Sequence, residues 1–152
     1  MISLLLIVKG TKGKYAFEIK NCKGEQLHIA LKENVLDPKG LHMWPNNTDF
    51  EAIIAGLNYI YTNRGKNNIP VDSAILVYTT FENNYQVASG IKTARQENIK
   101  VYVETIGMYK NLLRKFGAKD DTVKILFAPN DFSHHFDNIE DLLNCQRVSR
   151  KP

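Results

Sequence analysis

Three apolar segments at the start of the chain predict an antiparallel meander. Residues 2–8 form an uninterrupted apolar run, which is typical of a strand that is covered on both faces. Residues 15–19 and 27–31 alternate between larger apolar and smaller or polar side chains, which is the period of a strand. Glycine-containing turns at 10–14 and 21–24 join the three segments, so we expect neighbouring strands in antiparallel order.

Helical and strand patterns alternate in the rest of the chain. The helix that we expect to begin at Thr48 has one apolar stripe, formed by Phe50, Ile53, Ile54, Leu57 and Ile60. The later pattern predicts strands at 74–78, 99–103 and 123–128, and helices at 83–97, 109–116 and 137–146. Residues 37–47 contain two prolines and a glycine and are expected to form a loop, held against the core by Met43 and Trp44.

This pattern predicts an α/β domain with a mixed sheet. Strand–helix–strand units require right-handed crossovers and parallel strands, whereas the opening meander supplies antiparallel strands. The expected element order is β-β-β-α-β-α-β-α-β-α, in a mixed five-stranded sheet with helices on both faces. A doubly wound α/β domain would fit the half from residue 74 onward, but the meander argues against it.

Composition narrows the class of protein without identifying a ligand. The 152 residues fit a single domain, expected over 1–146, followed by a basic tail over 147–152. A net charge of +4 permits a polyanionic partner without requiring one. Cys22 and Cys145 have no metal-ligand spacing, which argues against zinc and favours a reducing, cytoplasmic location. The opening apolar run is too short to span a bilayer and lacks signal-peptide features, so no membrane association is expected.

Three stretches of sequence carry a resemblance to a known family. Residues 49–57, DFEAIIAGL, resemble the first helix of ribonuclease H proteins, where a catalytic Glu precedes small residues and Leu. Residues 74–80, AILVYTT, resemble the family's fourth strand, which normally ends in a Thr-Asp-Ser-like triplet. Residues 127–135, FAPNDFSHH, followed by Asn138 and Asp141, resemble the closing strand, the histidine-containing loop and the last helix. The resemblance implies a ribonuclease H-like fold.

The resemblance also implies two Mg²⁺ ions, held by carboxylates, that cleave the RNA strand of an RNA–DNA hybrid. In this chain most of those carboxylates are missing. The first strand offers Lys9 where the family has a catalytic Asp, and Thr80 stands in the place of another Asp. The resemblance leaves three catalytic candidates, namely Glu51, Asp141 and His134. An ammonium group beside the ions would oppose their binding, so we expect a catalytically degenerate domain with no metal site and no cofactor.

The catalytic candidates also have structural explanations. Thr48 and Glu51 have the spacing of a capping box, in which each side chain satisfies a free backbone amide of the other residue. His134 and His135 fit equally well as polar residues on a surface loop.

Basic side chains give a second functional signal. They form two groups: Lys9, Lys12 and Lys14 around the first turn, and Lys110, Arg114 and Lys115 near the third helix. In the family, the equivalent helical region grips the backbone of the duplex. Such side chains bind phosphates with an affinity that falls as salt rises, although a solvated charged face is the alternative.

Three functional hypotheses follow. The first is a degenerate domain that binds an RNA–DNA hybrid or another duplex, or that scaffolds a nucleic-acid-processing complex. The second is a divergent active nuclease that requires Mg²⁺ and recruits Glu82, Asp131 or Asp141. The third is a protein-interaction domain of a viral, phage or mobile-element accessory factor. The sequence contains no dinucleotide, P-loop or serine-hydrolase motif.

Overall fold

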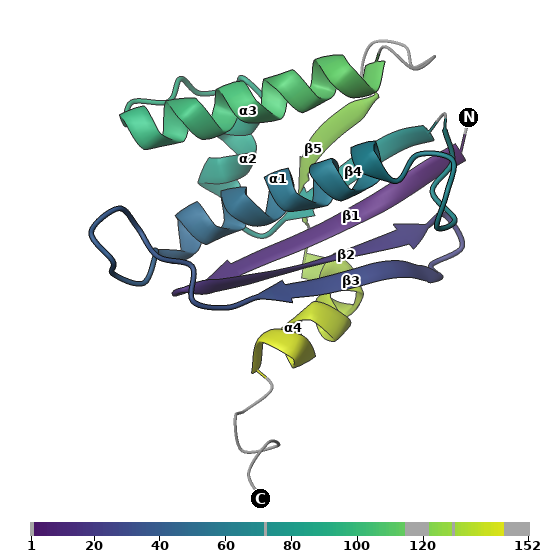
Figure 1. The fold of residues 1–152 in the computed structure, drawn as a ribbon, viewed down its shortest axis with the longest axis horizontal. Coiled ribbons are helices and arrows are strands. Elements are labelled where there is room, and N and C mark those ends of the chain that lie inside the picture. Colours follow the sequence, from purple (N-terminus) through teal and green to yellow (C-terminus); the bar gives the residue numbers. More distant parts are fainter. Residues whose placement is uncertain (1, 72, 115–121, 129, 145–152) are drawn as a thin grey trace, which may run out of the picture.

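The chain forms a five-stranded mixed sheet with helices on both faces (Figure 1). The computed structural model describes residues 2–71, 73–114, 122–128 and 130–144. The strands are β1 (Ile2–Thr11), β2 (Lys14–Asn21), β3 (Gln26–Lys32), β4 (Ser73–Thr79) and β5 (Val123–Phe127). The helices are α1 (Pro45–Thr62), α2 (Glu82–Ala88), α3 (Glu97–Arg114) and α4 (Asp137–Asn144), and a short 3₁₀ helix, η1 (Asn130–Phe136), precedes α4.

The strand order across the sheet is β3-β2-β1-β4-β5. The strands β1, β2 and β3 pair in antiparallel fashion, as the meander predicts. The strands β1, β4 and β5 pair in parallel, so β1 is the central strand where the two halves meet. The predicted α/β class with a mixed five-stranded sheet is confirmed.

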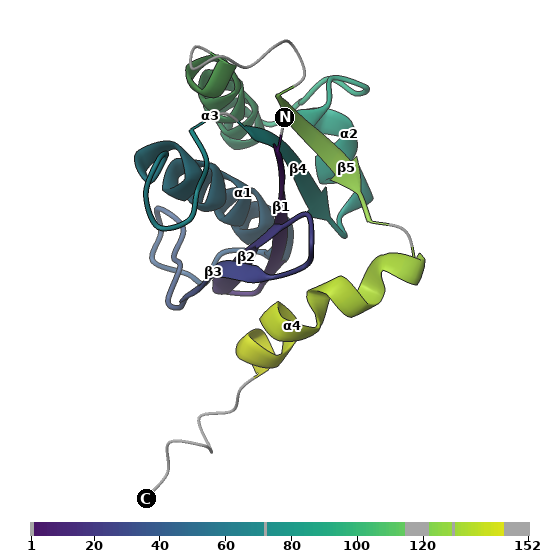
Figure 2. The ribbon, with the colours of Figure 1, turned by 90° about the vertical axis from the view of Figure 1, so that its right-hand side faces the viewer.

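The two faces of β1 are covered by different helices. Leu4, Leu6 and Val8 point into the larger core, beneath α1 and α3, and are fully buried. Ile7 points to the opposite face and packs in a smaller cluster with residues of η1 and α4. Figure 2 shows α1, α2 and α3 on one side of the sheet and α4 on the other. Since successive side chains of a strand alternate between faces, coverage on both faces explains the unbroken apolar run.

The expected element order contains six strands, one more than the observed sheet, and one of the six is wrong. Residues 99–103 lie in α3, an 18-residue helix, and not in the sheet. The buried side chains of α3 are Ile99, Ile106 and Leu113, which repeat every seven residues and therefore lie on one helical face. Over only five residues, the alternation of Ile, Val and Val also fits a strand, and the short segment did not distinguish the two structures. The residues that were assigned to a separate helix, from Tyr109 to Arg114, form the end of α3.

The helix expected over 83–97 is also wrong in its length. The helix α2 ends at Ala88, and Gly90 adopts a φ of +81°, a left-handed conformation that commonly terminates helices. For the last helix, the predicted start at Asp137 is confirmed. Residues 145–146 and the tail over 147–152 lie outside the described residues.

The start of α1 differs from the prediction in a way that rules out the capping box. The helix begins at Pro45, so Thr48 and Glu51 both lie inside it. The Oγ1 of Thr48 donates hydrogen bonds to the carbonyl oxygens of Thr11, at 2.8 Å, and Pro45, at 3.0 Å. Trp44, which we expected against the core, is 63% exposed, whereas Met43 is partly buried there.

A close contact at Gly10 sets the distance between α1 and β1. A Cβ atom on Gly10 would lie 2.3 Å from the backbone nitrogen of Asp49, 2.3 Å from Oγ1 of Thr48 and 2.7 Å from the carbonyl oxygen of Pro45. Only a residue without a side chain allows the first turns of α1 to lie this close to the strand. The contact therefore places Asp49 against the end of the sheet.

Polar contacts attach α4 to the other face of the sheet. Glu18 of β2 is fully buried, and its Oε2 accepts hydrogen bonds from Gln26 at 2.7 Å and from Asn138 at 2.8 Å. The Nζ of Lys20 lies 3.7 Å from Oε1 of Glu18. Lys14 donates to the carbonyl oxygen of Leu143 at 2.5 Å, in the last turn of α4. None of the described helices is long and apolar enough to cross a membrane.

We expect Gly10→Ala to lower the free energy of unfolding by about 2–4 kcal/mol, since its Cβ would force α1 away from β1. The matched control is Gly107→Ala in α3, where an added Cβ meets no atom within 4 Å. That substitution should raise the stability by about 0.5–1 kcal/mol, because alanine loses less backbone entropy in a helix. Urea denaturation measures both changes, and equal effects at the two positions would contradict the contact at Gly10.

Candidate functional site

A buried carboxylate lies where α1 meets the ends of β1 and β4. Asp49 is fully buried, and its Oδ2 accepts hydrogen bonds from Oγ1 of Thr79, at 2.6 Å, and from Nδ2 of Asn84, at 3.1 Å. The same Asn84 amide donates to the carbonyl oxygen of Asn46 at 2.8 Å. One carboxylate thus connects the first turn of α1 with β4 and α2.

The environment of Asp49 favours its neutral form. Burial raises the pKa of the Asp49 carboxyl to about 7, although the hydrogen bonds from Thr79 and Asn84 and the charge of Lys9 act in the opposite direction. The Oδ1 atoms of Asp49 and Asn84 are buried and have no hydrogen-bond partner among the described residues. Thr79, Asn84 and the backbone amide of Gly10 all favour the ionised carboxylate, but burial outweighs these three hydrogen bonds.

An ion pair lies near the same end of β1, on the α4 side of the sheet. The Nζ of Lys9 is 2.7 Å from Oε2 of Glu140, with 29% and 38% of the two side chains exposed. An ion pair exposed to this extent contributes only about 0–1 kcal/mol to stability. Its main effect is to fix a positive charge at the position where the family resemblance places a metal-ligating carboxylate.

The described residues do not fit a pair of Mg²⁺ ions. Two such ions require several shared oxygen ligands, usually carboxylates. Within the described ranges, no three His, Cys, Asp or Glu side chains gather closely enough to hold a metal ion. In addition, the carboxylate of Glu140 is already engaged by the ammonium group of Lys9.

The helical phase of α1 explains why Asp49 and not Glu51 occupies the site. Asp49 lies four residues before Ile53 and eleven before Ile60, so it shares their buried stripe. Glu51 is only partly buried and hydrogen-bonds the hydroxyl of Tyr102 in α3. Burial, and then this contact with Glu51, raise the pKa of the Tyr102 hydroxyl. Of the two acids in this part of α1, Asp49 therefore faces the ends of β1 and β4, whereas Glu51 faces α3.

The other catalytic candidates lie apart from Asp49. Asp141 and His134 are exposed, and with Glu51 they form no common cluster among the described side chains. The charged groups that act on the neighbouring His135 are His134, Lys20 and Glu18, and its pKa is lowered, mainly by burial.

The acids of the divergent-nuclease hypothesis are also separated. Glu82 is exposed at the start of α2, and Asp141 is exposed on α4. The side chain of Asp131 lies outside the described part of the chain.

The predicted phosphate-binding residues divide into two groups at opposite ends of the sheet. Lys9 and Lys14 bind α4, and the Nζ of Lys12 lies 4.8 Å above the ring of Trp44. Lys110 donates to the carbonyl oxygen of Ala88 at 3.3 Å, and Arg114 to Oδ1 of Asn111 at 3.4 Å. Figure 1 shows that the last turns of α3 lie near the start of β1, away from the site. Lys115 lies outside the described residues.

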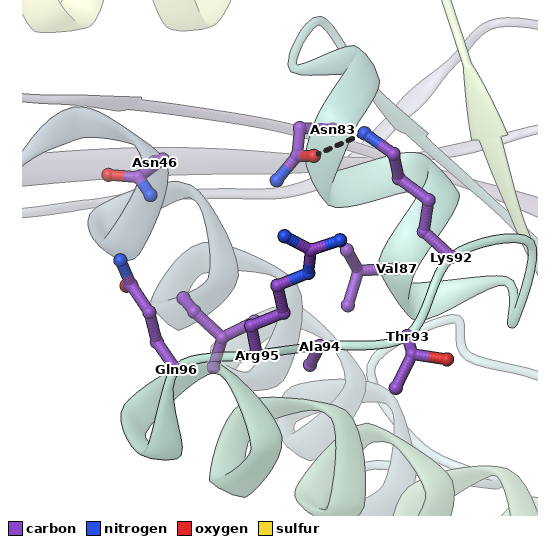
Figure 3. A pocket seen from close by; sticks show the side chains of 9 residues that line it. Asn46, Asn83, Val87, Lys92, Thr93, Ala94, Arg95 and Gln96 are labelled. Carbon is purple, nitrogen blue, oxygen red and sulfur yellow. Dashed lines mark hydrogen bonds between the residues drawn. The ribbon is translucent and has the colours of Figure 1, made fainter.

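A basic pocket adjoins the buried carboxylate (Figure 3). Its volume is about 540 Å³. It is lined by Asn46, Asn83, Val87, Lys92, Thr93, Ala94, Arg95, Gln96 and Ile99. Lys92 donates to Oδ1 of Asn83 at 3.4 Å, and the guanidinium group of Arg95 extends into the space between these side chains. Asn84, which binds both Asp49 and the backbone of Asn46, connects the pocket with the buried network.

Lys92 and Arg95 are not among the predicted binding residues, because both fall inside the helix expected over 83–97. The signal that was available is Gly90, a residue type that frequently follows the last helical turn. Ending the helix there would have placed the two basic residues in a loop between helices, where binding residues often occur.

We expect Asp49→Asn to stabilise the protein at alkaline pH. The pKa of Asp49 rises from its ordinary value of 3.8 to about 7 on folding, so the native state binds the extra proton and loses stability as pH rises through this interval. Asparagine resembles the neutral carboxyl and removes that loss, which is on the order of 2–4 kcal/mol.

Thermal or urea unfolding between about pH 5 and pH 8 measures the effect. The gain should be largest at the upper end of the range and should shrink steadily toward the lower end, because the loss in the wild type builds up between its unfolded and folded pKa values. Glu51→Gln is the matched control on the same helix, and it should leave the slope of stability against pH unchanged. A parallel slope for Asp49→Asn and the wild type would contradict the raised pKa.

Comparisons with known proteins extend the description of the fold. The sequence matches no family model and no curated protein. Among solved structures, LC11-RNase H1, isolated from compost by a metagenomic approach, superimposes with a TM-score of 0.68 at 16% identity, covering 95% of this chain and 100% of that one. The same enzyme in complex with an RNA/DNA hybrid gives a TM-score of 0.65 at 17% identity, with the same coverage.

A third similar structure is the N-terminal RNase H domain of a Mycobacterium tuberculosis protein, with a TM-score of 0.66 at 12% identity. It is matched over 99% of this chain and 100% of its own length. At these identities the similarity concerns the arrangement of the backbone. Together with the strand order and the position of α4, it shows that the chain has the ribonuclease H-like fold.

Proposed function

We propose that this domain binds nucleic acid, with an RNA–DNA hybrid or another duplex as partner, and does not cleave it. The ion pair between Lys9 and Glu140 is the observation that supports the absence of cleavage. It puts a fixed ammonium group at the end of β1, where two-metal cleavage would need a carboxylate. Binding of nucleic acid is supported by the fold, since a similar protein of that fold is in complex with an RNA/DNA hybrid.

The basic pocket supplies contacts for a phosphate backbone. Lys92 and Arg95 project from the loop that precedes α3, and Asn46 in the first turn of α1 lies across the pocket. The helix dipole makes the start of α1 favourable for an anion. Arg95 forms no ion pair with any residue in the described ranges, so no internal carboxylate competes with a phosphate for its guanidinium group.

The divergent-nuclease alternative has less support from the geometry. It requires three or more carboxylates around a common point, and the described side chains supply no such group. A role as a scaffold in a nucleic-acid-processing complex, in the cytoplasm, is compatible with binding and remains part of the proposal.

A labelled RNA–DNA hybrid tests both halves of the proposal. We expect binding that weakens steeply with salt, that is the same in EDTA and in Mg²⁺, and that leaves the RNA strand intact. Fluorescence anisotropy measures the affinity, and a denaturing gel detects cleavage. Mg²⁺-dependent cleavage that Asp49→Asn abolishes and Glu51→Gln preserves would overturn the non-cleaving assignment.

Substitutions in the pocket test where the backbone binds. Lys92→Gln and Arg95→Gln should each weaken binding to all duplex sequences and lower the slope of log affinity against log salt by about one. Lys66→Gln is the matched control, because Lys66 is exposed in the turn between α1 and β4, at the other end of the sheet. If all three variants lose affinity equally, binding is not directed by the pocket.

A further inference from the structure

The loop between β3 and α1 carries an exposed patch at the same end of the sheet as the basic pocket. We name it the Trp44 patch, and it consists of Lys12, Leu36, Leu41, His42 and Trp44. Trp44 and Leu41 are each 63% exposed, and Leu36 is 47% exposed. In Figure 1 this loop extends beyond the sheet at the left, where α1 begins. Trp44 directly precedes α1, and Asn46, two residues later, lines the pocket.

The loop has a defined structure that holds these side chains outward. The Oδ1 of Asp37 accepts hydrogen bonds from the backbone nitrogens of Lys39, at 2.8 Å, and Leu41, at 3.0 Å. Leu36 and His42 form an antiparallel bridge across the loop. These bonds oppose collapse of the apolar side chains onto the core, so their exposure is a property of the folded loop.

The first turn of the meander fixes the base of the loop. The backbone nitrogen of Gly13 donates to the carbonyl oxygen of Met43 at 2.8 Å, and that of Val35 donates to the carbonyl oxygen of Gly13 at 2.8 Å. Gly13 has a φ of +76°, and a Cβ there would lie 2.8 Å from Cγ of His42. The turn and the loop therefore move as one unit, which keeps Lys12 beside Trp44.

The chemistry of the patch combines an aromatic face with a cation. The Nζ of Lys12 lies 4.8 Å from the centre of the Trp44 ring, within the range of a cation–π contact. Beside them is a hollow of about 400 Å³, lined by Lys12, Asp37, Gly40, Leu41, His42 and Trp44. Proteins bind single-stranded nucleic acid by stacking bases on exposed aromatic rings while nearby cations bind the phosphates.

We propose that Trp44 stacks on an unpaired base of the bound nucleic acid, with Lys12 contacting the phosphate beside that base. This inference rests on the proposed function and adds a preference for substrates in which a single strand extends from the duplex. An unpaired base is favoured over a protein segment because a lysine lies over the ring, and because the patch continues across the start of α1 toward Lys92 and Arg95. A duplex whose backbone phosphates bind Lys92 and Arg95 would direct a protruding strand toward the loop.

The chain contains one tryptophan, so tryptophan emission, excited at wavelengths that tyrosine does not absorb, reports on Trp44 alone. The test compares a blunt RNA–DNA hybrid with the same hybrid carrying a single-stranded thymidine extension. We expect the extended hybrid to quench the emission more strongly and to bind more tightly. Trp44→Ala should weaken binding of the extended hybrid about five- to a hundredfold, whereas Trp44→Phe should retain most of the affinity.

Two further variants separate stacking from other effects. Val71→Ala removes an apolar side chain of similar exposure just before β4, at the other end of the sheet, and should change nothing. Lys12→Gln should lower the salt dependence of binding to the extended hybrid but not to the blunt one. Anisotropy of a labelled strand provides the affinities of all variants, including the two that lack tryptophan.

The outcomes distinguish this inference from the function on which it rests. Equal binding of the extended hybrid by the wild type and Trp44→Ala, with unchanged emission, would overturn the stacking role and leave the proposed function intact. Absence of binding to either hybrid at any salt concentration would overturn both. A self-association in sedimentation that Trp44→Ala abolishes would assign the patch to a second copy of the chain and would also overturn the stacking role.

Discussion

In this fold, the first turns of α1 can reach the end of β1 only because Gly10 has no side chain. The contact leaves no room for a Cβ and brings the backbone of Asp49 directly against the strand. Asp49 then becomes the polar centre of the junction, where Thr79 and Asn84 donate to its carboxylate. The position of α2, and through Asn84 that of the basic pocket, depends on this arrangement.

The charges around this junction are divided between the two faces of the sheet. On the α1 face, burial favours a neutral Asp49. On the α4 face, Lys9 and Glu140 neutralise each other. These two carboxyl groups therefore carry no uncompensated negative charge. A site built from several ionised carboxylates, in contrast, needs a bound cation to offset their charge. In the pocket, Lys92 and Arg95 form no ion pair with any described residue, so their positive charges are available to a polyanion.

The sequence was sufficient to predict the sheet but not the site. The meander and the strands at 74–78 and 123–128 were recognisable because their apolar patterns lie between clear turn signals. Residues 99–103 were misassigned, since five alternating residues fit both a strand and the buried face of a helix. Asp49 was overlooked in favour of Glu51 because a glutamate matched the residue type of the family. The helical phase with Ile53 and Ile60 was the better guide, and it was readable from the sequence.

The attachment of α4 has a consequence for the order in which the fold loosens. Its apolar contacts belong to the smaller of the two clusters, and much of the remaining attachment consists of polar groups around Glu18 and Lys14. Water can replace these partners when α4 detaches from the sheet. It would also solvate the Oε1 atom of Glu18, which is buried and has no hydrogen bond while α4 is in place. Local opening of this C-terminal segment therefore costs less free energy than opening of the α1 face. The last helix is the part of the domain best suited to exchange its place on the sheet for contacts with another molecule.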